Sequence, residues 1–313
     1  MKTELSREES AIHKFSTGNL ESLDKPDTTK HLLEYHDRHY SANLMSLSLV
    51  GNHELDILEE LALEHFSEVE NKDLSLTDFS GDVMFDETAF GHLIKIVPVK
   101  DLRNLEIIWP QLPPTHQYYN GNPLSLVSHC IGHEGKNSLL SELKKQDLAN
   151  SLSAGNGNRL QRAFGNFAIA IGLTEKGVAN KDEVIRLVFA YINNLKSKGS
   201  PPDHLFEEIH QMRQISWEFL TRTPALAYSK SMANKLMVWN DNKEEGPADV
   251  EVEDVLYKSY LFSEKRYELV QEYLDLLTPE NCLIMQRLRD FDKEEGLVEE
   301  PIYSTKYKKE PIA

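Results

Sequence analysis

The spacing of apolar and polar residues divides the chain into segments of helical and of strand character. Apolar side chains that recur every three or four residues predict amphipathic helices. The helical segments are 28–40, 53–66, 123–130, 138–145, 176–198, the segment from Pro202 to about 221, 224–238 and 267–277. Short apolar runs predict strands at 44–51, 92–99, 102–111, 159–173 and 281–288. This mixture predicts an α+β fold.

The same pattern predicts two related units joined by a linker. Residues 1–69 hold a helix, a strand and a second helix, the tail of one domain. Residues 70–91 are acidic without an apolar period and are predicted to be the linker, and 92–313 form the second domain. A weak internal repeat supports duplication, because 32–51 and 269–288 each predict a helix, a turn with Asn and an apolar strand.

Composition excludes several classes of partner. The formal net charge is −17, from 51 acidic and 34 basic residues, which argues against nucleic-acid binding. No apolar run of about 18 residues predicts a membrane span, and the charged start MKTELSREES is not a signal peptide. Cys130 and Cys282 make neither a metal pair nor a disulfide framework, so we expect a reducing, cytoplasmic compartment.

The densest polar chemistry lies in residues 128–158. His129 and His133 are four residues apart, and Glu134 and Gly135 follow directly. A helix beginning at Ser138 is predicted next. The polar strand at 150–155 is then broken by glycine and asparagine, which is typical of an edge strand with unpaired backbone groups.

These motifs resemble a known family. HCIGHEG and SLLSELK with the short strand after them, RNLEIIWPQ upstream and LLTPENCLIM downstream are similar to the insulysin branch of the pitrilysin-type M16 zinc metallopeptidases. The resemblance runs from about His13 to Ile312. It implies tandem units of antiparallel sheet backed by helices: the C-terminal part of a first domain in 1–69, and an inactive, substrate-anchoring second domain in 92–313.

The zinc motif of that family, HxxEH, is absent from this sequence, and so is HExxH. His31 and His36 are five residues apart, about 140° out of line on a helix, so they cannot share an ion. No catalytic residue, metal ligand or cofactor is therefore predicted within this chain, and zinc belongs to the full-length family. His129 and His133 have chelating spacing, but no Glu lies between them; a new metal site is the alternative interpretation.

The resemblance implies instead that this region is an exosite, a surface that holds the N-terminus of a peptide substrate. The residues that match the positions lining it are His129, Gly132, Glu134, Leu152, Ala154 and Asn156. A carboxylate would receive the α-ammonium group, and the strand would pair with the peptide backbone. Ala154 stands where the family usually has Gly, and Asn156 where it usually has Gln.

We therefore expect the non-catalytic, peptide-binding portion of an insulysin-like peptidase, inactive by itself. Its expected partners are a peptide substrate and either the complementary metallopeptidase half or another copy of the chain. Two alternatives remain open: a degenerate relative that acts as an interaction or scaffold subunit, and a fragment of a product that carries HxxEH upstream of Met1.

Overall fold

The computed structural model contains two compact units. It describes residues 2–14, 18–79, 81–115, 118, 121–157, 164–199, 201–245, 254–257, 260 and 262–312. Unit 1 comprises Met1–Lys14, Ser80–Gln214 and Leu261–Ala313, and unit 2 comprises Phe15–Phe79 and Ile215–Tyr260. The domain boundaries expected from the sequence stay a prediction.

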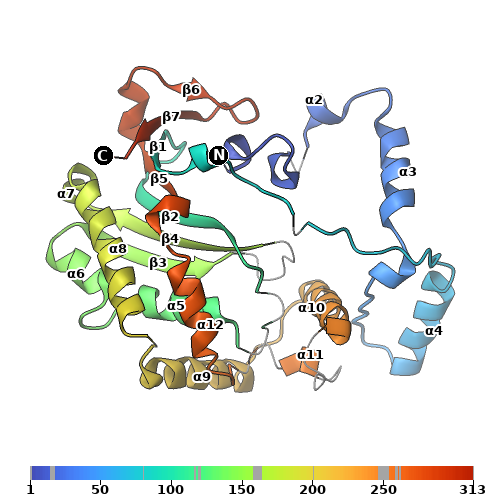
Figure 1. Cartoon of the computed structure of the whole chain (residues 1–313). Coiled ribbons are helices and arrows are strands. Elements are labelled where there is room, and N and C mark those ends of the chain that lie inside the picture. Colours follow the sequence, from blue (N-terminus) through green and yellow to red (C-terminus); the bar gives the residue numbers. More distant parts are fainter. Residues whose placement is uncertain are drawn as a thin grey trace. The chain divides into compact units, whose positions relative to one another are not determined.

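Unit 1 is built on a seven-stranded sheet (Figure 1). Its strands are β1 His92–Ile96, β2 Arg103–Leu112, β3 Ala149–Asn156, β4 Gly165–Leu173, β5 Leu283–Leu288, β6 Val298–Glu299 and β7 Lys306–Pro311. Their order is β3-β4-β2-β5-β1-β7-β6. Only β1 and β5 pair in parallel, and all other neighbours are antiparallel. The predicted α+β class with a mainly antiparallel sheet is confirmed.

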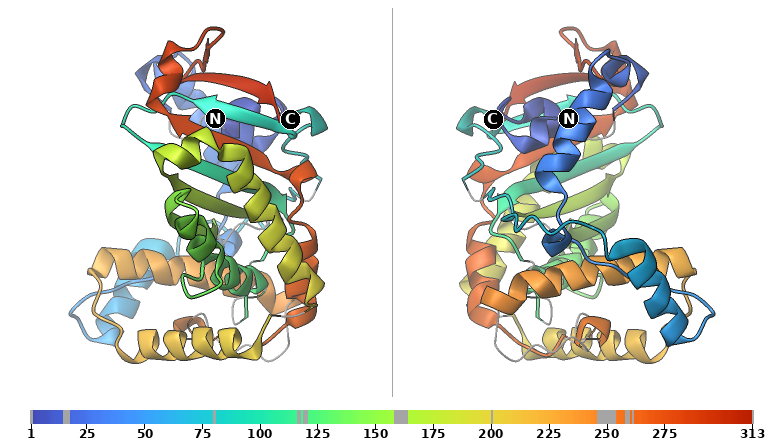
Figure 2. Two further views of the ribbon diagram at one scale, coloured as in Figure 1. Left: turned by 90° about the vertical axis from the view of Figure 1, so that its left-hand side faces the viewer. Right: turned by 90° about the vertical axis from the view of Figure 1, so that its right-hand side faces the viewer.

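Helices cover one face of this sheet. The helices of unit 1 are α1 Lys2–Leu5, α5 Pro123–Gly132, α6 Leu139–Lys145, α7 Glu175–Ala179, α8 Lys181–Ser197, α9 Asp203–Glu218, which runs into unit 2, and α12 Tyr267–Asp275. Figure 2 (left) shows α7 and α8 lying across the strands. The main core lies between these layers and includes Ile107, Trp109, Phe167 and Ile169, all fully buried.

Neighbouring residues of a strand face opposite sides, so the sheet has a second core. Ile94, Ile108 and Met285 lie in this second cluster together with Met84 and Phe85. Met84 and Phe85 come from the segment predicted to be a linker without an apolar period. An irregular segment has no regular repeat of side-chain directions. Hydrophobic periodicity in the sequence therefore cannot predict which of its apolar residues are buried. The second half of 70–91 therefore packs as part of unit 1.

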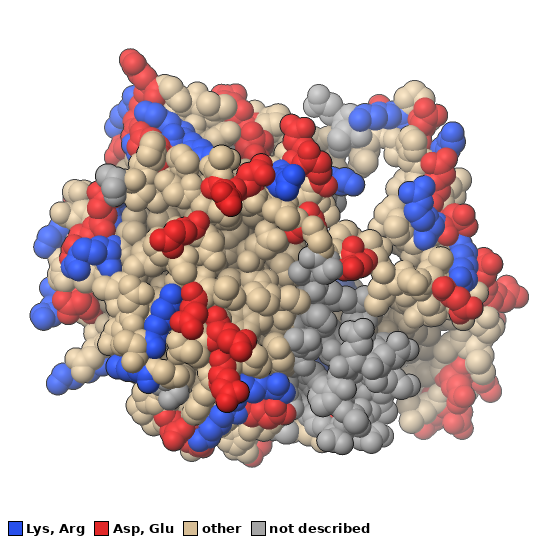
Figure 3. All heavy atoms as spheres, viewed as in Figure 1, with Lys and Arg blue, Asp and Glu red and all other residues tan. Residues whose placement is uncertain are grey.

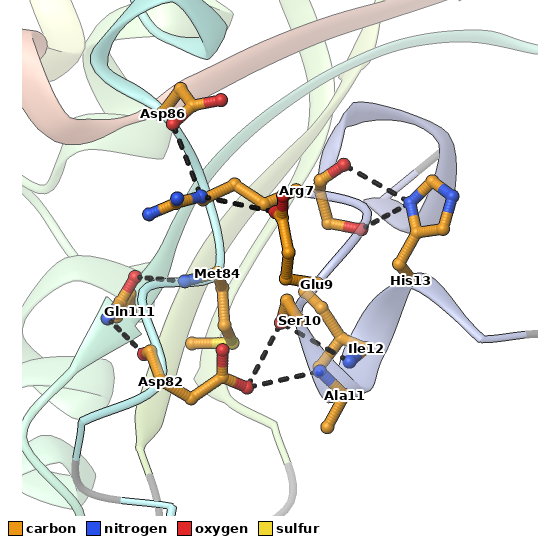
Figure 4. Close-up of polar contacts among 11 residues, drawn as sticks. Arg7, Glu9, Ser10, Ala11, Ile12, His13, Asp82, Met84, Asp86 and Gln111 are labelled. Atoms are coloured by element: carbon orange, nitrogen blue, oxygen red, sulfur yellow. Dashed lines mark hydrogen bonds and ion pairs between the residues drawn. The ribbon is translucent and has the colours of Figure 1, made fainter.

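Polar contacts fasten the N-terminal segment to this second face (Figure 4). The Arg7 amide donates to the Met84 carbonyl at 2.9 Å. The Ser10 hydroxyl donates to the Asp82 carboxylate at 3.0 Å, and the Gln111 side chain of β2 bridges both Met84 N and Asp82 O. The N-terminal segment thus covers part of this face of the sheet.

One predicted helix is divided in two. The sequence predicts a single helix over 176–198, whereas α7 ends at Ala179 and α8 begins at Lys181. The Thr174 hydroxyl accepts a hydrogen bond from Gly177 N and caps α7. A Cβ atom at Gly177 would lie 1.9 Å from the Leu148 carbonyl oxygen, so only glycine permits this close approach.

Unit 2 is helical in its described part. Its helices are α2 Leu20–Leu23, α3 Thr28–His39, α4 Leu55–Phe66, α10 Ala225–Glu245 and α11 Asp254–Tyr257, with the 3₁₀ turn η2 at Ala42–Leu44. Many large apolar side chains are exposed on it. The exposed apolar side chains of α3, of α4 and of the segment between these helices include Leu32, Leu33, Tyr35, Leu47, Leu49, Leu55 and Leu63.

The predicted buried strand at 44–51 is wrong. This segment is extended but pairs with no strand among the described residues, and Leu47 is 43% exposed. The Ser48 carbonyl instead accepts a hydrogen bond from Ser229 of α10. The matching half of the repeat does form a strand, because β5 has β1 and β2 beside it. An apolar run becomes a strand only where a neighbour satisfies its backbone.

We predict that Ile107→Ala lowers the free energy of unfolding by about 3 kcal/mol, because it leaves a cavity in the main core. Val99→Ala is the control: Val99 is 97% exposed, so its truncation should change stability by less than about 0.5 kcal/mol. Urea unfolding followed by circular dichroism measures both. Equal effects of the two substitutions would contradict the assignment of β2 to the centre of the core.

Candidate functional site

Helix α5 contains His129, and His133 directly follows its last residue. The Asn122 side chain accepts from Leu124 N and caps the helix, and Pro123 occupies its first turn. Apolar residues such as Val127 and Ile131 are fully buried, so one face of α5 is anchored in the main core. Both α5 and α6 pack against β3.

Strand β3 is an edge strand, as the sequence predicts. It pairs with β4 from Ser151↔Gly172 to Asn156↔Phe167, and no other described strand lies beside it. The Leu152 side chain is 7% exposed and joins the main core, whereas its neighbours Ser151 and Ser153 are exposed. The backbone of β3 therefore has one side available for a further extended chain.

Gly132, the last residue of α5, lies against this strand. A Cβ atom there would lie 3.7 Å from both the backbone nitrogen and the Cβ atom of Ala154. The structure thus brings together Gly132 and Ala154, two of the predicted exosite residues. His129 lies about one helical turn earlier on α5.

Two other predicted residues, Glu134 and Asn156, take no part in this contact. Glu134 is exposed and makes no hydrogen bond or ion pair with the other described residues. Asn156 lies at the end of β3, and its side-chain Nδ2 is buried without a hydrogen-bond partner in the described part of the chain. A buried donor without a partner is rare in proteins, so this amide is a candidate contact for a ligand carbonyl.

The sequence did not point to Glu208, which the structure places beside both histidines. Its Oε2 atom lies 3.1 Å from His129 Nε2 and 3.7 Å from His133 Nε2. Glu208 belongs to α9, 79 residues from His129 along the chain. The helical pattern of the sequence predicts that Glu208 is exposed. It does not predict that Glu208 lies beside the two histidines.

These three side chains do not fit a zinc site. The Gly135 amide donates a hydrogen bond to His133 Nδ1 at 3.0 Å. A ring nitrogen that accepts a hydrogen bond carries no hydrogen itself, so in the neutral ring the hydrogen is on Nε2. A zinc ligand needs a free lone pair on the coordinating nitrogen and a second-shell acceptor at the other. Across the described residues, no group of three or more His, Cys, Asp or Glu side chains could hold a metal.

The charges around the sheet are mixed. On the face in Figure 3, Lys and Arg lie among Asp and Glu and form no large basic patch. Of the helices in the described part of the chain, none combines the length and the apolar character needed to cross a bilayer.

Comparison with known proteins identifies the family. The model of the peptidase M16 inactive domain matches residues 28–212, and that of the middle or third domain of peptidase M16 matches 217–313. The chain belongs to the M16 peptidase family. It is similar to insulin-degrading enzyme from Drosophila melanogaster, with 33% identity over 309 residues, and from Homo sapiens, with 35% identity over 305 residues.

These alignments cover 97% and 96% of this chain but 30% and 28% of the two relatives, so the chain spans about a third of their length or less. The fold agrees with the crystal structure of pitrilysin at a TM-score of 0.84 and 25% identity, covering 100% of this chain and 32% of that one. A peptidase M16 inactive domain from Pseudomonas fluorescens shares the fold at a TM-score of 0.59 and 15% identity, with coverage of 91% and 63%.

We predict that the purified chain binds well under one zinc ion per molecule and leaves a fluorogenic peptide uncut when zinc is added. The hydrogen bond from Gly135 to His133 opposes coordination, and the HxxEH motif is absent. Elemental analysis after dialysis measures the metal. Stoichiometric zinc that is lost in both His129→Ala and His133→Ala would instead establish the new metal site.

Proposed function

We propose that this chain is the non-catalytic, substrate-anchoring portion of an insulysin-like M16 peptidase. It binds extended peptides by their N-terminal ends at His129, Gly132, Glu134, Leu152, Ala154 and Asn156. The proposal rests on one observation above all: the unpaired edge of β3 lies directly beside the last turn of α5. Proteolysis itself is assigned to a zinc site carried outside these residues.

Backbone pairing would supply most of the affinity. A peptide added beside β3 satisfies backbone groups of both chains, as in other cases of strand addition. The side chains of Ser151 and Ser153 are exposed and small, so they leave the strand accessible. Ala154 adds a methyl group where the family usually has Gly, and Asn156 is one methylene shorter than the usual Gln, so this end of the strand should differ in shape from that of the family.

The expected affinity is modest. One edge strand covers only one side of a peptide, and few side chains of the ligand are buried. Association also loses translational and rotational freedom and orders the peptide. We expect a Kd in roughly the micromolar to millimolar range.

Unit 2 favours a second contact, with another protein chain. The exposed side chains Leu32, Leu33, Leu55 and Leu63 are too numerous for an ordinary solvated surface. The extended segment 45–50 has no strand beside it among the described residues. We propose that the complementary metallopeptidase half covers this surface and that another copy of the chain does so when the half is missing. A scaffold role without peptide turnover would use the same surface.

The two cysteines support a reducing, cytoplasm-like location within this proposal. Cys130 and Cys282 are both buried and unpaired. Burial raises the pKa of each thiol to about 12, so the reactive thiolate is disfavoured in both. Such thiols serve as small apolar core residues.

We predict that an extended peptide with a free N-terminus binds about tenfold more tightly than its N-acetylated form, because acetylation removes the charge-assisted contact of the ammonium group. Fluorescence anisotropy with a label at the peptide's C-terminus measures both affinities. Equal affinities would show that the N-terminus is not recognised and would remove the main support for the exosite.

Substitution of Gly132 tests whether the peptide binds beside the last turn of α5. Gly132→Leu should weaken the peptide at least about tenfold, because the added side chain covers Ala154 at the strand edge. Gly132→Ala is the matched control: its Cβ atom would make ordinary contacts at 3.7 Å, so binding should change less than about twofold. If neither variant alters the affinity while both stay folded, the peptide binds elsewhere.

The apolar surface of unit 2 predicts self-association of the isolated chain. Its mean mass by light scattering should rise with concentration, and the double variant Leu33→Ser/Leu63→Ser should shift this rise to higher concentration. The control is Glu34→Gln, which changes a polar neighbour of Leu33 and should leave the mass curve unchanged. A wild-type chain that is monomeric at every concentration would refute the contact between copies.

A further inference from the structure

We propose that Lys235 of α10 is a nucleophilic amine, to which an acyl thioester transfers its acyl group. The residue belongs to unit 2, whereas the residues assigned to peptide binding belong to unit 1, so the proposal does not rest on that function. It is supported by the groups that surround the amine: aromatic rings and a carbonyl oxygen, without a carboxylate among the described residues.

The first argument is the aromatic surface around the amine. Lys235 Nζ lies over the Tyr260 ring, 4.7 Å from its centroid. The Tyr260 ring packs against Trp217 at 5.4 Å between centroids, and Trp217 packs against Tyr257 at 6.2 Å. These rings come from the last turn of α9, from α11 and from the third residue after α11, and α10 and α11 lie in contact (Figure 1). The cluster attracts the ammonium group but also removes part of its water.

The second argument is the lack of a counter-charge. Nζ donates a hydrogen bond to the Leu256 carbonyl oxygen at 3.4 Å, and no carboxylate in the described part of the chain forms an ion pair with it. Asp254, the buried carboxylate of α11, accepts a hydrogen bond from the Tyr257 hydroxyl at 2.9 Å. Removal from water therefore lowers the pKa of the Lys235 ammonium group.

The third argument is the chemistry of the amine. A lysine with a lowered pKa has a larger neutral fraction, and only the neutral amine has a lone pair that attacks a carbonyl carbon. In the proposed step, Nζ forms a bond to the carbonyl carbon of the thioester. The C–S bond then breaks, and the sulfur leaves with the electron pair. The amine proton passes through water to the thiolate, so the products are an amide and a thiol and no group is oxidised or reduced.

The amide product suits the same surroundings. Its remaining N–H group can still donate to the Leu256 carbonyl, while the charge that lacks a carboxylate partner is removed. An ordinary exposed lysine gains no such advantage, because water solvates its ammonium group. Lys235 is also partly exposed, so a thioester in solution can reach the amine.

The experiment measures acetylation of the full chain by acetyl-coenzyme A at low conversion and pH 8. Tandem mass spectrometry locates each acetyl group and gives its initial rate of formation. Lys230 is the internal reference, because it lies on the same helix and is exposed. We expect Lys235 to be acetylated at least about threefold faster than Lys230. A ratio of one or less in the folded wild-type chain refutes the proposal.

Two aromatic truncations test the cause of the rate. Tyr260→Ala removes the ring beside the amine and admits water, so the ratio of the two rates should fall to about one. Phe219→Ala is the matched control: Phe219 is 76% exposed, and its loss should leave the ratio unchanged. If the ratio stays high or rises in Tyr260→Ala, access alone sets the rate and the proposal is wrong.

Unfolding the wild-type chain in concentrated urea gives a check that needs no variant. Both lysines are then solvated, so their acetylation rates should become equal to within about twofold. A preference for Lys235 that persists in urea would show that neighbouring residues along the chain cause it, and it would overturn the role of the aromatic cluster.

Discussion

Backbone pairing between strands is the constraint on which the structure of this chain depends. A strand exists where a neighbour satisfies its N–H and C=O groups. β2 and β5 lie inside the sheet with a partner on each side, and their side chains form both cores. Among the described strands, β3 has a partner on one side only, which leaves backbone groups on its other side available for the extended ligand that we propose.

The same constraint explains unit 2. Residues 45–50 have the apolar character of a strand and follow a helix and a 3₁₀ turn, just as β5 does after α12. No described strand lies beside them, and the side chains of Met45, Leu47, Leu49 and Val50 stay exposed. The same requirement thus accounts for the open edge of β3 in unit 1 and for the exposed apolar segment 45–50 in unit 2.

Glycine decides how closely the helices approach the sheet. At Gly132, the absence of a side chain leaves the end of the β3 edge uncovered beside α5. At Gly177, a Cβ atom would collide with the Leu148 carbonyl, so glycine allows α7 to pack directly after β4. The site therefore depends on small residues that set backbone distances as well as on the polar groups that would contact a ligand.

The sequence by itself determined the local elements and the edge strand. Apolar periodicity located β1, β2, β5 and α5, the glycine and asparagine residues after Leu152 marked the strand edge, and Ser138 marked the start of α6. The tertiary structure alone decided which elements meet. The burial of Met84, the absence of a described strand beside 45–50 and the contact of Glu208 with His129 all depend on residues distant in the chain. A local sequence pattern does not identify such residues.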